Sequence, residues 1–320
     1  MKGLFRIVAI VFAVAIAYVA VDHLFPRPMA KAALDIQHWL GGVEHKTVRI
    51  PGFEIAYLDG GQGEPLVMVH GIGADKDNWS QIAPFLRGSG RLIAPDLPGF
   101  GESDKPADAD YSVIAQVERL GQFLDALQVP RAHLAGNSMG GAIVLAFAKL
   151  HPERVQSLWL LDPAGVGAAK ESEMFRAYRE DGQLLLFAKT PDDFARVMEL
   201  AMSKQPPVPY SVKHELALAA ANNYALHTRI FRDLTAEVPH LERDVAGLVT
   251  PTLIVWGEED RVLDPSGAEI LHQALPNSQL VLMPGIGHMP MLEAPYRAAA
   301  DYKKFRANLL APPRLAEPPQ

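Results

Sequence analysis

The chain contains no cysteine, which excludes disulfide bonds, thiol nucleophiles and cysteine-ligated zinc sites. It also lacks long basic runs, and its net charge is a modest -7 over 320 residues, so we expect no nucleic-acid partner. We expect neither a cofactor nor a metal. The chain is rich in apolar residues, which make up 49% of it. This content is enough for a large core, and we expect one domain that carries an insertion.

The longest apolar run lies at the N-terminus. Lys2 and Arg6 precede residues 7–21, which are uncharged and almost wholly apolar. About 20 apolar residues cross a bilayer, and residues 4–25 reach that length if Arg6 and Asp22 extend to the two interfaces. The positive flank places the N-terminus in the cytoplasm and the rest of the chain on the periplasmic side.

We therefore predict a single-pass membrane protein in which residues 1–28 form the anchor and the main domain is extracytoplasmic. A signal peptide cleaved after Ala15-Ile16-Ala17 and a buried soluble helix are the alternatives. Residues 29–44 follow, and their apolar side chains recur at helical spacing between Met29 and Leu40. This pattern predicts an amphipathic juxtamembrane helix, separated from the anchor by two prolines, that lies on the membrane surface or packs on the protein body.

From residue 45 onward, short β-branched runs alternate with helical stretches, which is typical of an α/β domain with a mainly parallel sheet. Eight strands are predicted, at residues 47–50, 54–58, 66–69, 91–95, 132–135, 156–161, 252–256 and 279–283. Between residues 167 and 249 the alternation gives way to helical spacing, so we expect a helical cap inserted after strand 6, over the C-terminal ends of the strands. The core then comprises residues 45–166 and 250–311, and the proline-rich residues 312–320 are predicted to be disordered.

The most informative motif is Gly136-Asn137-Ser138-Met139-Gly140. It follows a predicted strand and precedes a predicted helix, which is the context of a nucleophile elbow. In an elbow, glycines let the flanking backbones pass closely enough to expose the serine at the tip of the turn. We predict that Ser138 is a nucleophile, and an ordinary glycine-rich turn is the alternative that the motif alone leaves open.

A serine nucleophile needs a base, because its hydroxyl is a poor nucleophile at neutral pH. His288 is the candidate, since it lies in a glycine-rich loop directly after the last predicted strand. An acid that orients the imidazole is expected after the seventh strand, and Asp260 is the choice. Four other carboxylates stay open as alternatives: Glu258, Glu259 and Asp264 in the same loop, and Asp162 after the sixth strand.

The oxyanion of a tetrahedral intermediate needs two backbone N–H donors. Met139 supplies one, because it directly follows the nucleophile. Ile72 is the expected second donor, since it lies in the glycine-rich loop after the third predicted strand.

These motifs together resemble the α/β-hydrolase superfamily over about residues 45–310. The segments that carry the resemblance are His70 to Gly73, Asp96 to Ser103, Gly136 to Gly141, Trp256 to Asp260, and Gly287-His288. More narrowly, Asp260 to Ala268, Thr190 to Asp193 and the apolar N-terminus are similar to membrane-anchored monoacylglycerol lipases and to bacterial membrane-bound lysophospholipases and phospholipases A.

The resemblance implies an α/β-hydrolase fold and hydrolysis of acyl esters of glycerol lipids. We therefore expect a lipid ester as substrate and a membrane bilayer as partner, and a homo-oligomer stays open. The same elbow sequence is common in the carbon–carbon bond hydrolases of aromatic degradation, which are the alternative enzyme class. A binding module without catalytic activity is a third hypothesis, which the presence of all three triad residues disfavours.

Overall fold

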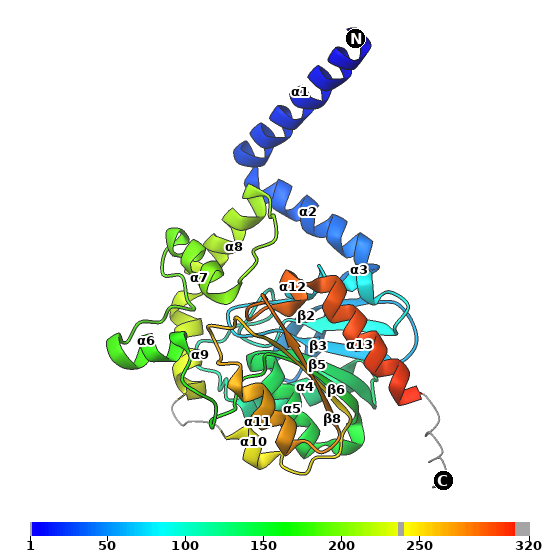
Figure 1. Cartoon of the computed structure of the whole chain (residues 1–320), viewed down its shortest axis with the longest axis vertical. Coiled ribbons are helices and arrows are strands. Elements are labelled where there is room, and N and C mark those ends of the chain that lie inside the picture. Colours follow the sequence, from blue (N-terminus) through cyan, green and yellow to red (C-terminus); the bar gives the residue numbers. More distant parts are fainter. Residues whose placement is uncertain (1, 236–239, 311–320) are drawn as a thin grey trace, which may run out of the picture.

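The computed structural model describes residues 2–235 and 240–310, and its centre is one eight-stranded sheet (Figure 1). The strands lie in the order β1-β2-β4-β3-β5-β6-β7-β8. β2 runs antiparallel to both of its neighbours, and the other pairs are parallel, so the predicted mostly parallel sheet is confirmed. The strands are β1 (Glu44–Ile50), β2 (Phe53–Gly60), β3 (Pro65–Val69), β4 (Arg91–Pro95), β5 (Ala132–Asn137), β6 (Val155–Leu161), β7 (Thr252–Gly257) and β8 (Ser278–Met283).

Helices cover both faces of the sheet. They are α4 (Val113–Ala126), α5 (Met139–Leu150) and α11 (Ser266–Ala274) on one face, and α3 (Ala83–Leu86) and α13 (Pro295–Leu310) on the other. Alternate strand residues face the two layers: in β3, Val67 and Val69 pack on the first, and Leu66 and Met68 on the second. Consequently β5 and β7 are buried along their whole length, as the continuous apolar runs of parallel strands require.

Between β6 and β7, the described residues form a group of helices that we call the cap. Its helices are α6 (Glu173–Asp181), η3 (Pro191–Asp193), α7 (Phe194–Ala201), α8 (Tyr210–Asn222), α9 (Tyr224–Thr235) and α10 (Leu241–Asp244). They bury an apolar cluster around Phe187, Leu200 and Phe231. Ile72 and Met289, from the loops after β3 and β8, pack against this cluster, so apolar cap surface adjoins the C-terminal edge of the sheet.

Two helices precede the sheet and meet at an angle (Figure 1). In α1 (Lys2–Leu24), the stretch Gly3–Leu24 is long and apolar enough to cross a membrane, with a mean hydropathy of 2.6. Phe25 then leaves the helical conformation, with φ -130° and ψ 59°, as the residue before a proline tends to do. The second helix, α2 (Pro26–Gly41), packs on the body of the protein, where Ala30 and Gly41 are buried.

The end of α1 is joined to the cap. Asp22, which we expected at a membrane interface, is buried, and its carboxylate accepts a hydrogen bond from the Ser211 backbone N–H at 3.3 Å. Because Ser211 lies in the first turn of α8, this carboxylate satisfies an N–H that the helix itself leaves unpaired. The His23 ring stacks on Tyr210, with centroids 4.1 Å apart. Residues 312–320, predicted to be disordered, lie outside the described residues.

Candidate active site

Ser138 lies at the tip of the turn between β5 and α5 with φ 54° and ψ -121°, a positive-φ conformation that is strained for a side-chain-bearing residue. The turn is tight enough to require both motif glycines. A Cβ on Gly136 would lie 2.3 Å from the Gly140 carbonyl oxygen, and a Cβ on Gly140 would lie 2.3 Å from that of Val69. The backbone therefore has the geometry of a nucleophile elbow rather than of an ordinary glycine-rich turn.

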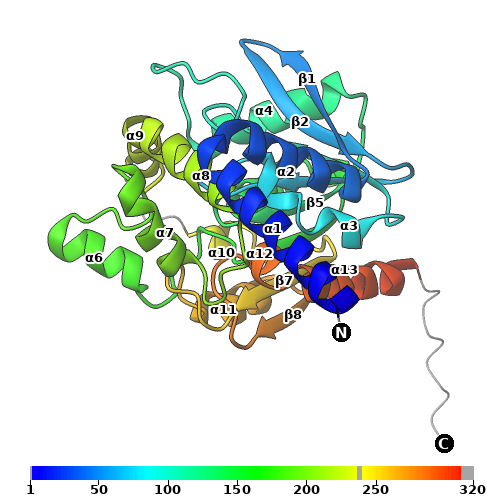
Figure 2. The same cartoon turned by 90° about the horizontal axis from the view of Figure 1, so that it is seen from above.

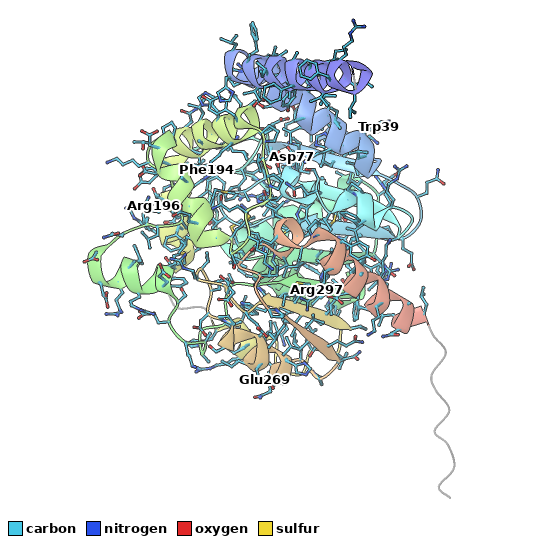
Figure 3. All side chains as sticks on the ribbon, turned by 45° about the horizontal axis from the view of Figure 1, so that its top comes forward. Trp39, Asp77, Phe194, Arg196, Glu269 and Arg297 are labelled. Atoms are coloured by element: carbon cyan, nitrogen blue, oxygen red, sulfur yellow. The ribbon has the colours of Figure 1, made fainter. Side chains whose placement is uncertain are left out.

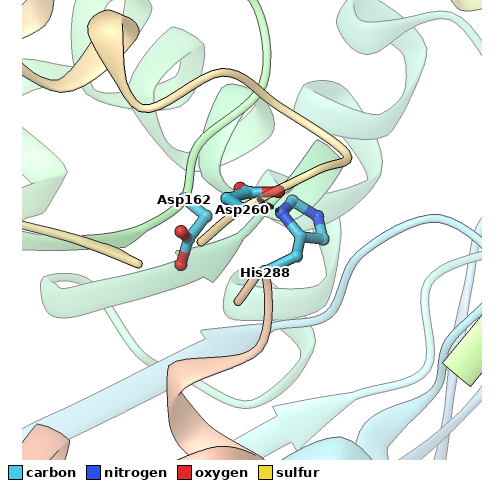
Figure 4. Close-up of side chains that lie close together, drawn as sticks. All are labelled: Asp162, Asp260 and His288. Carbon is cyan, nitrogen blue, oxygen red and sulfur yellow. Dashed lines mark hydrogen bonds and ion pairs between the residues drawn. The ribbon is translucent and has the colours of Figure 1, made fainter. Parts of the chain in front are cut away.

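His288 and Asp260 are buried and joined by a hydrogen bond of 2.7 Å between Nδ1 and Oδ2 (Figure 4). The other oxygen of Asp260 accepts the backbone N–H groups of Val262 and Leu263 at 2.8 and 2.9 Å. These bonds orient the carboxylate and leave Oδ2 for the imidazole. Since Oδ2 accepts only from a protonated Nδ1, the neutral ring presents Nε2 as a proton acceptor.

The alternative acids occupy other positions. Glu258 and Glu259 are exposed, and Asp264 accepts the Ser266 N–H at the start of α11 at 3.0 Å. Asp162 is different, because it is fully buried beside the pair, and ligand atoms of Asp162, Asp260 and His288 all lie within 4.8 Å of one another. Burial, and then the charge of Asp260, raise the pKa of Asp162 well above its usual value.

One oxygen of Asp162 accepts the Gly257 N–H at 2.8 Å, and the other has no hydrogen-bond partner among the described residues. The raised pKa favours the protonated form of this carboxyl group, which avoids the repulsion that two neighbouring carboxylates would exert on each other. Two carboxylates and an imidazole are also ligand types that cations accept. Here, however, the imidazole and Asp260 already bind each other.

Asn137, directly before Ser138, links the elbow to the loop that carries His288. The Asn137 side-chain amide donates to the His288 carbonyl oxygen at 3.1 Å and to the Leu161 carbonyl oxygen at 3.1 Å. Among the described residues, the Ser138 hydroxyl and the imidazole form no hydrogen bond with each other. In enzymes without substrate this bond is often long and forms only in the substrate complex.

The histidine loop is also tied to the cap. The His288 N–H donates to the Ala201 carbonyl oxygen at 2.8 Å. Glu293 accepts the Gly287 and Met289 N–H groups at 3.0 and 3.2 Å on one carboxylate oxygen, and the Lys204 N–H at 2.8 Å on the other. Sequence reasoning missed Glu293 and Asn137, because their partners are backbone groups that leave no motif.

The loop after β3 lies against Ser138, since a Cβ on Gly71 would be 3.2 Å from the Ser138 Cβ. Buried His70 fixes the direction of this loop. Its Nε2 accepts the Leu97 N–H at 3.0 Å, so Nδ1 carries the proton and donates to the Gly71 carbonyl oxygen at 2.7 Å. Burial lowers the pKa of His70, which keeps this neutral tautomer. Because the described peptide bonds are trans, the Ile72 N–H of the same peptide points away from His70.

The remaining predicted residue, Met139, is buried in the first turn of α5, directly after Ser138. Its N–H is one of those that a helix leaves unpaired at its N-terminus.

A family model described as alpha/beta hydrolase fold matches residues 64–295. The chain belongs to the α/β-hydrolase fold family.

Several proteins that are similar to this chain are lipases or phospholipases. Lipase 3 of Moraxella sp. (strain TA144) is 41% identical over 250 residues, which cover 77% of this chain and 78% of that lipase. The monoacylglycerol lipase ABHD6 of Homo sapiens is 28% identical over 313 residues, covering 92% and 91% of the two chains. The crystal structure of a membrane phospholipase A superposes with a TM-score of 0.87 at 38% identity, covering 97% of this chain and 99% of that one. These similarities confirm the predicted enzyme class, a carboxylic ester hydrolase.

Proposed function

We propose that this α/β-hydrolase cleaves carboxylic acyl esters of glycerol lipids, either monoacylglycerols or lysophospholipids and phospholipids, through Ser138, His288 and Asp260. The observation that carries the proposal is the buried 2.7 Å bond between His288 and Asp260, next to an elbow in which Ser138 has a strained, positive φ. A serine, a histidine and an acid in these roles are the parts of an acyl-transfer triad.

In the proposed reaction, the Ser138 hydroxyl oxygen attacks the ester carbonyl carbon while its proton passes to His288 Nε2. Asp260 holds the ring in the required tautomer and stabilises the imidazolium. The Ile72 and Met139 N–H groups stabilise the oxyanion. The alcohol then leaves with the proton from His288, and an acyl-enzyme remains. Water, deprotonated by the same imidazole, releases the fatty acid and restores Ser138.

The apolar surroundings of the site support a lipid substrate. Two residues near the reaction centre pack against the apolar cluster of the cap. They are Ile72, which lies in the loop after β3, and Met289, which directly follows His288. A fatty acyl chain gains about 0.8 kcal/mol for each methylene that such a surface removes from water. The membrane-spanning length of α1 supports a location at a bilayer, and we place the hydrolase on its periplasmic side because Lys2 and Arg6 flank the span at its N-terminal end.

The triad is tested by labelling the full-length protein with a fluorophosphonate and measuring turnover of a p-nitrophenyl ester. Ser138→Ala should abolish labelling and lower kcat by about 10⁴-fold or more, while exposed Ser203→Ala should change neither. Labelling that persists in Ser138→Ala would move the nucleophile elsewhere.

The substrate class is tested with a panel of monoacylglycerols and lysophospholipids of increasing chain length. We expect turnover to rise over several carbons before levelling, since each buried methylene adds transfer energy. Preference for acetyl esters, or efficient cleavage of a vinylogous diketone, would instead favour the carbon–carbon bond hydrolase. Release of the radiolabelled acid reports hydrolysis of each ester, and loss of the conjugated chromophore reports cleavage of the diketone.

A further inference from the structure

Helix α2 has one face on the protein body and an adjacent apolar face that the body does not cover. Ile36, Trp39 and Leu40, spaced by three and four residues, have exposed fractions of 58%, 75% and 45%. Side chains at this spacing lie on one side of a helix. Figure 3 shows Trp39 near the upper edge of the molecule, on the side from which α1 rises. An exposed aromatic and aliphatic stripe of this kind marks an interaction surface.

The stripe continues onto two neighbouring elements. The Leu40 carbonyl oxygen accepts a hydrogen bond from Arg87 at 3.1 Å, directly after α3. Phe85 of α3 and Tyr296 of α13 are 40% and 72% exposed, and their rings meet edge to face at 5.8 Å. Figure 2, seen from above, shows α2, α3 and the start of α13 together beneath α1. We call Ile36, Trp39, Leu40, Phe85 and Tyr296 the bilayer-contact face.

The orientation of this face is fixed relative to α1. His38 Nε2 lies 2.5 Å from an Asp77 carboxylate oxygen, and the Ser80 hydroxyl donates to the Gln37 side-chain oxygen at 2.8 Å. Both contacts hold α2 against the segment that leads into α3. The Asp22 bond joins α1 to the cap, so α1 and α2 are each bonded to the body of the protein.

We propose that the bilayer-contact face inserts into the boundary between headgroups and acyl chains of the membrane that α1 crosses, as a second, independent attachment. This rests on the membrane location in the proposed function. The occupant is a bilayer rather than a second copy, because α1 exposes apolar side chains on every side and a second helix covers one stripe only. Tryptophan and tyrosine beside a span are typical of membrane interfaces.

The tryptophans provide a direct test. Of the four in the chain, Trp39 is exposed, whereas Trp79, Trp159 and Trp256 are at most 1% exposed. The full-length protein is reconstituted into phosphatidylcholine vesicles with and without brominated acyl chains, which quench tryptophan at the depth of the bromine. We expect quenching in brominated vesicles, and its loss in Trp39→Phe. Equal fluorescence in both vesicles, with Trp39 still open to aqueous acrylamide, would overturn the proposal.

A charged substitution on the bilayer-contact face tests this attachment separately from the anchor. Ile36→Glu keeps α1, so the protein should stay in membranes after a carbonate wash, but quenching of Trp39 should fall. Turnover of vesicle-borne monoacylglycerol should drop about fivefold, while turnover of a soluble p-nitrophenyl ester stays unchanged. Val249→Glu, at a 71% exposed position before β7, is the matched control and should change nothing.

Three results are distinguishable. If the wild type did not turn over the soluble ester, the proposed function would be contradicted, but the fluorescence result would still stand. Quenching in Ile36→Glu equal to that of the wild type would overturn the role of the face. Shielding of Trp39 that requires a high protein-to-lipid ratio, with cross-links between chains at position 39, would assign the face to a second copy and also overturn it.

Discussion

Replacing Asp260 by asparagine should give a folded protein whose histidine holds the wrong tautomer. The asparagine oxygen can still accept the Val262 and Leu263 N–H groups, which bind Asp260 at 2.8 and 2.9 Å. Its amide nitrogen then takes the place of the oxygen that lies 2.7 Å from His288 Nδ1. Two donors cannot face each other, so Nδ1 loses its proton and Nε2 gains one. The nitrogen that should accept the Ser138 proton is then already occupied.

The size of the loss follows from this geometry. A wrong tautomer in a triad costs about 10⁴-fold in kcat, which is about 5.5 kcal/mol of transition-state stabilisation. Flipping the amide would restore the tautomer, but it would leave two backbone donors unpaired at about 1–3 kcal/mol each. Either route predicts a loss of at least about thirtyfold, with unfolding by urea little changed because the unflipped amide stays the main conformer.

The neighbouring Asp162 gives the variant a characteristic pH profile. In the wild type, the charge of Asp260 contributes to the raised pKa of Asp162. Removing that charge lowers the pKa, so Asp162 ionises at a lower pH than before. Its oxygen is within 4.8 Å of the imidazole, close enough to stabilise an imidazolium after a small shift. Residual activity of Asp260→Asn should therefore rise with pH.

The assay is kcat/KM for a soluble p-nitrophenyl ester between pH 5 and 9, with circular dichroism as the folding control. The double variant Asp162→Asn/Asp260→Asn should lose the rise with pH. Retention of more than about a tenth of wild-type turnover by the double variant would refute the reasoning, because no carboxylate would then face the imidazole.

Three further changes test the packing around the site. Gly136→Ala places a Cβ 2.3 Å from the Gly140 carbonyl oxygen, so we expect little folded protein, or a loss of at least about 3 kcal/mol in urea unfolding. In the wild type the Lys76 Nζ lies 3.2 Å from the buried Asp96 carboxylate, and Lys76→Met removes this counter-ion. The free energy of unfolding should fall by about 3–5 kcal/mol. Burial lowers the pKa of His227 from the usual 6.5 to about 4. Between these two pH values the native state therefore binds fewer protons than the unfolded chain. Tm should therefore fall between pH 6.5 and 4, and His227→Phe should flatten the fall.

The strands and the order of the site residues could be predicted because each depends on local pattern. Continuous apolar runs located β5 and β7, and the glycine spacing around Ser138 indicated a turn that no larger residue permits. His288 and Asp260 followed from their positions directly after strands, since parallel strands deliver their C-terminal loops to one edge.

What the sequence did not predict depends on contacts between distant segments. His70, Asn137 and Glu293 act through backbone carbonyl and N–H groups of other loops, which every residue carries and no motif marks. Asp22 was expected at a membrane interface because it flanks an apolar run. Its burial depends on the N-terminus of α8, 189 residues further along the chain, which no local window includes.

The joint at Asp22 limits the modularity of the N-terminal helix. Its carboxylate is part of α1 but accepts a hydrogen bond from the Ser211 N–H in the first turn of α8. Exchanging α1 for an unrelated apolar helix would keep a helix long enough to cross a membrane, but it would remove this acceptor. The transplanted helix would then change a cap element, because the Ser211 N–H would lose its acceptor. A chimera that is to behave like the parent must therefore retain the junction from Asp22 onward.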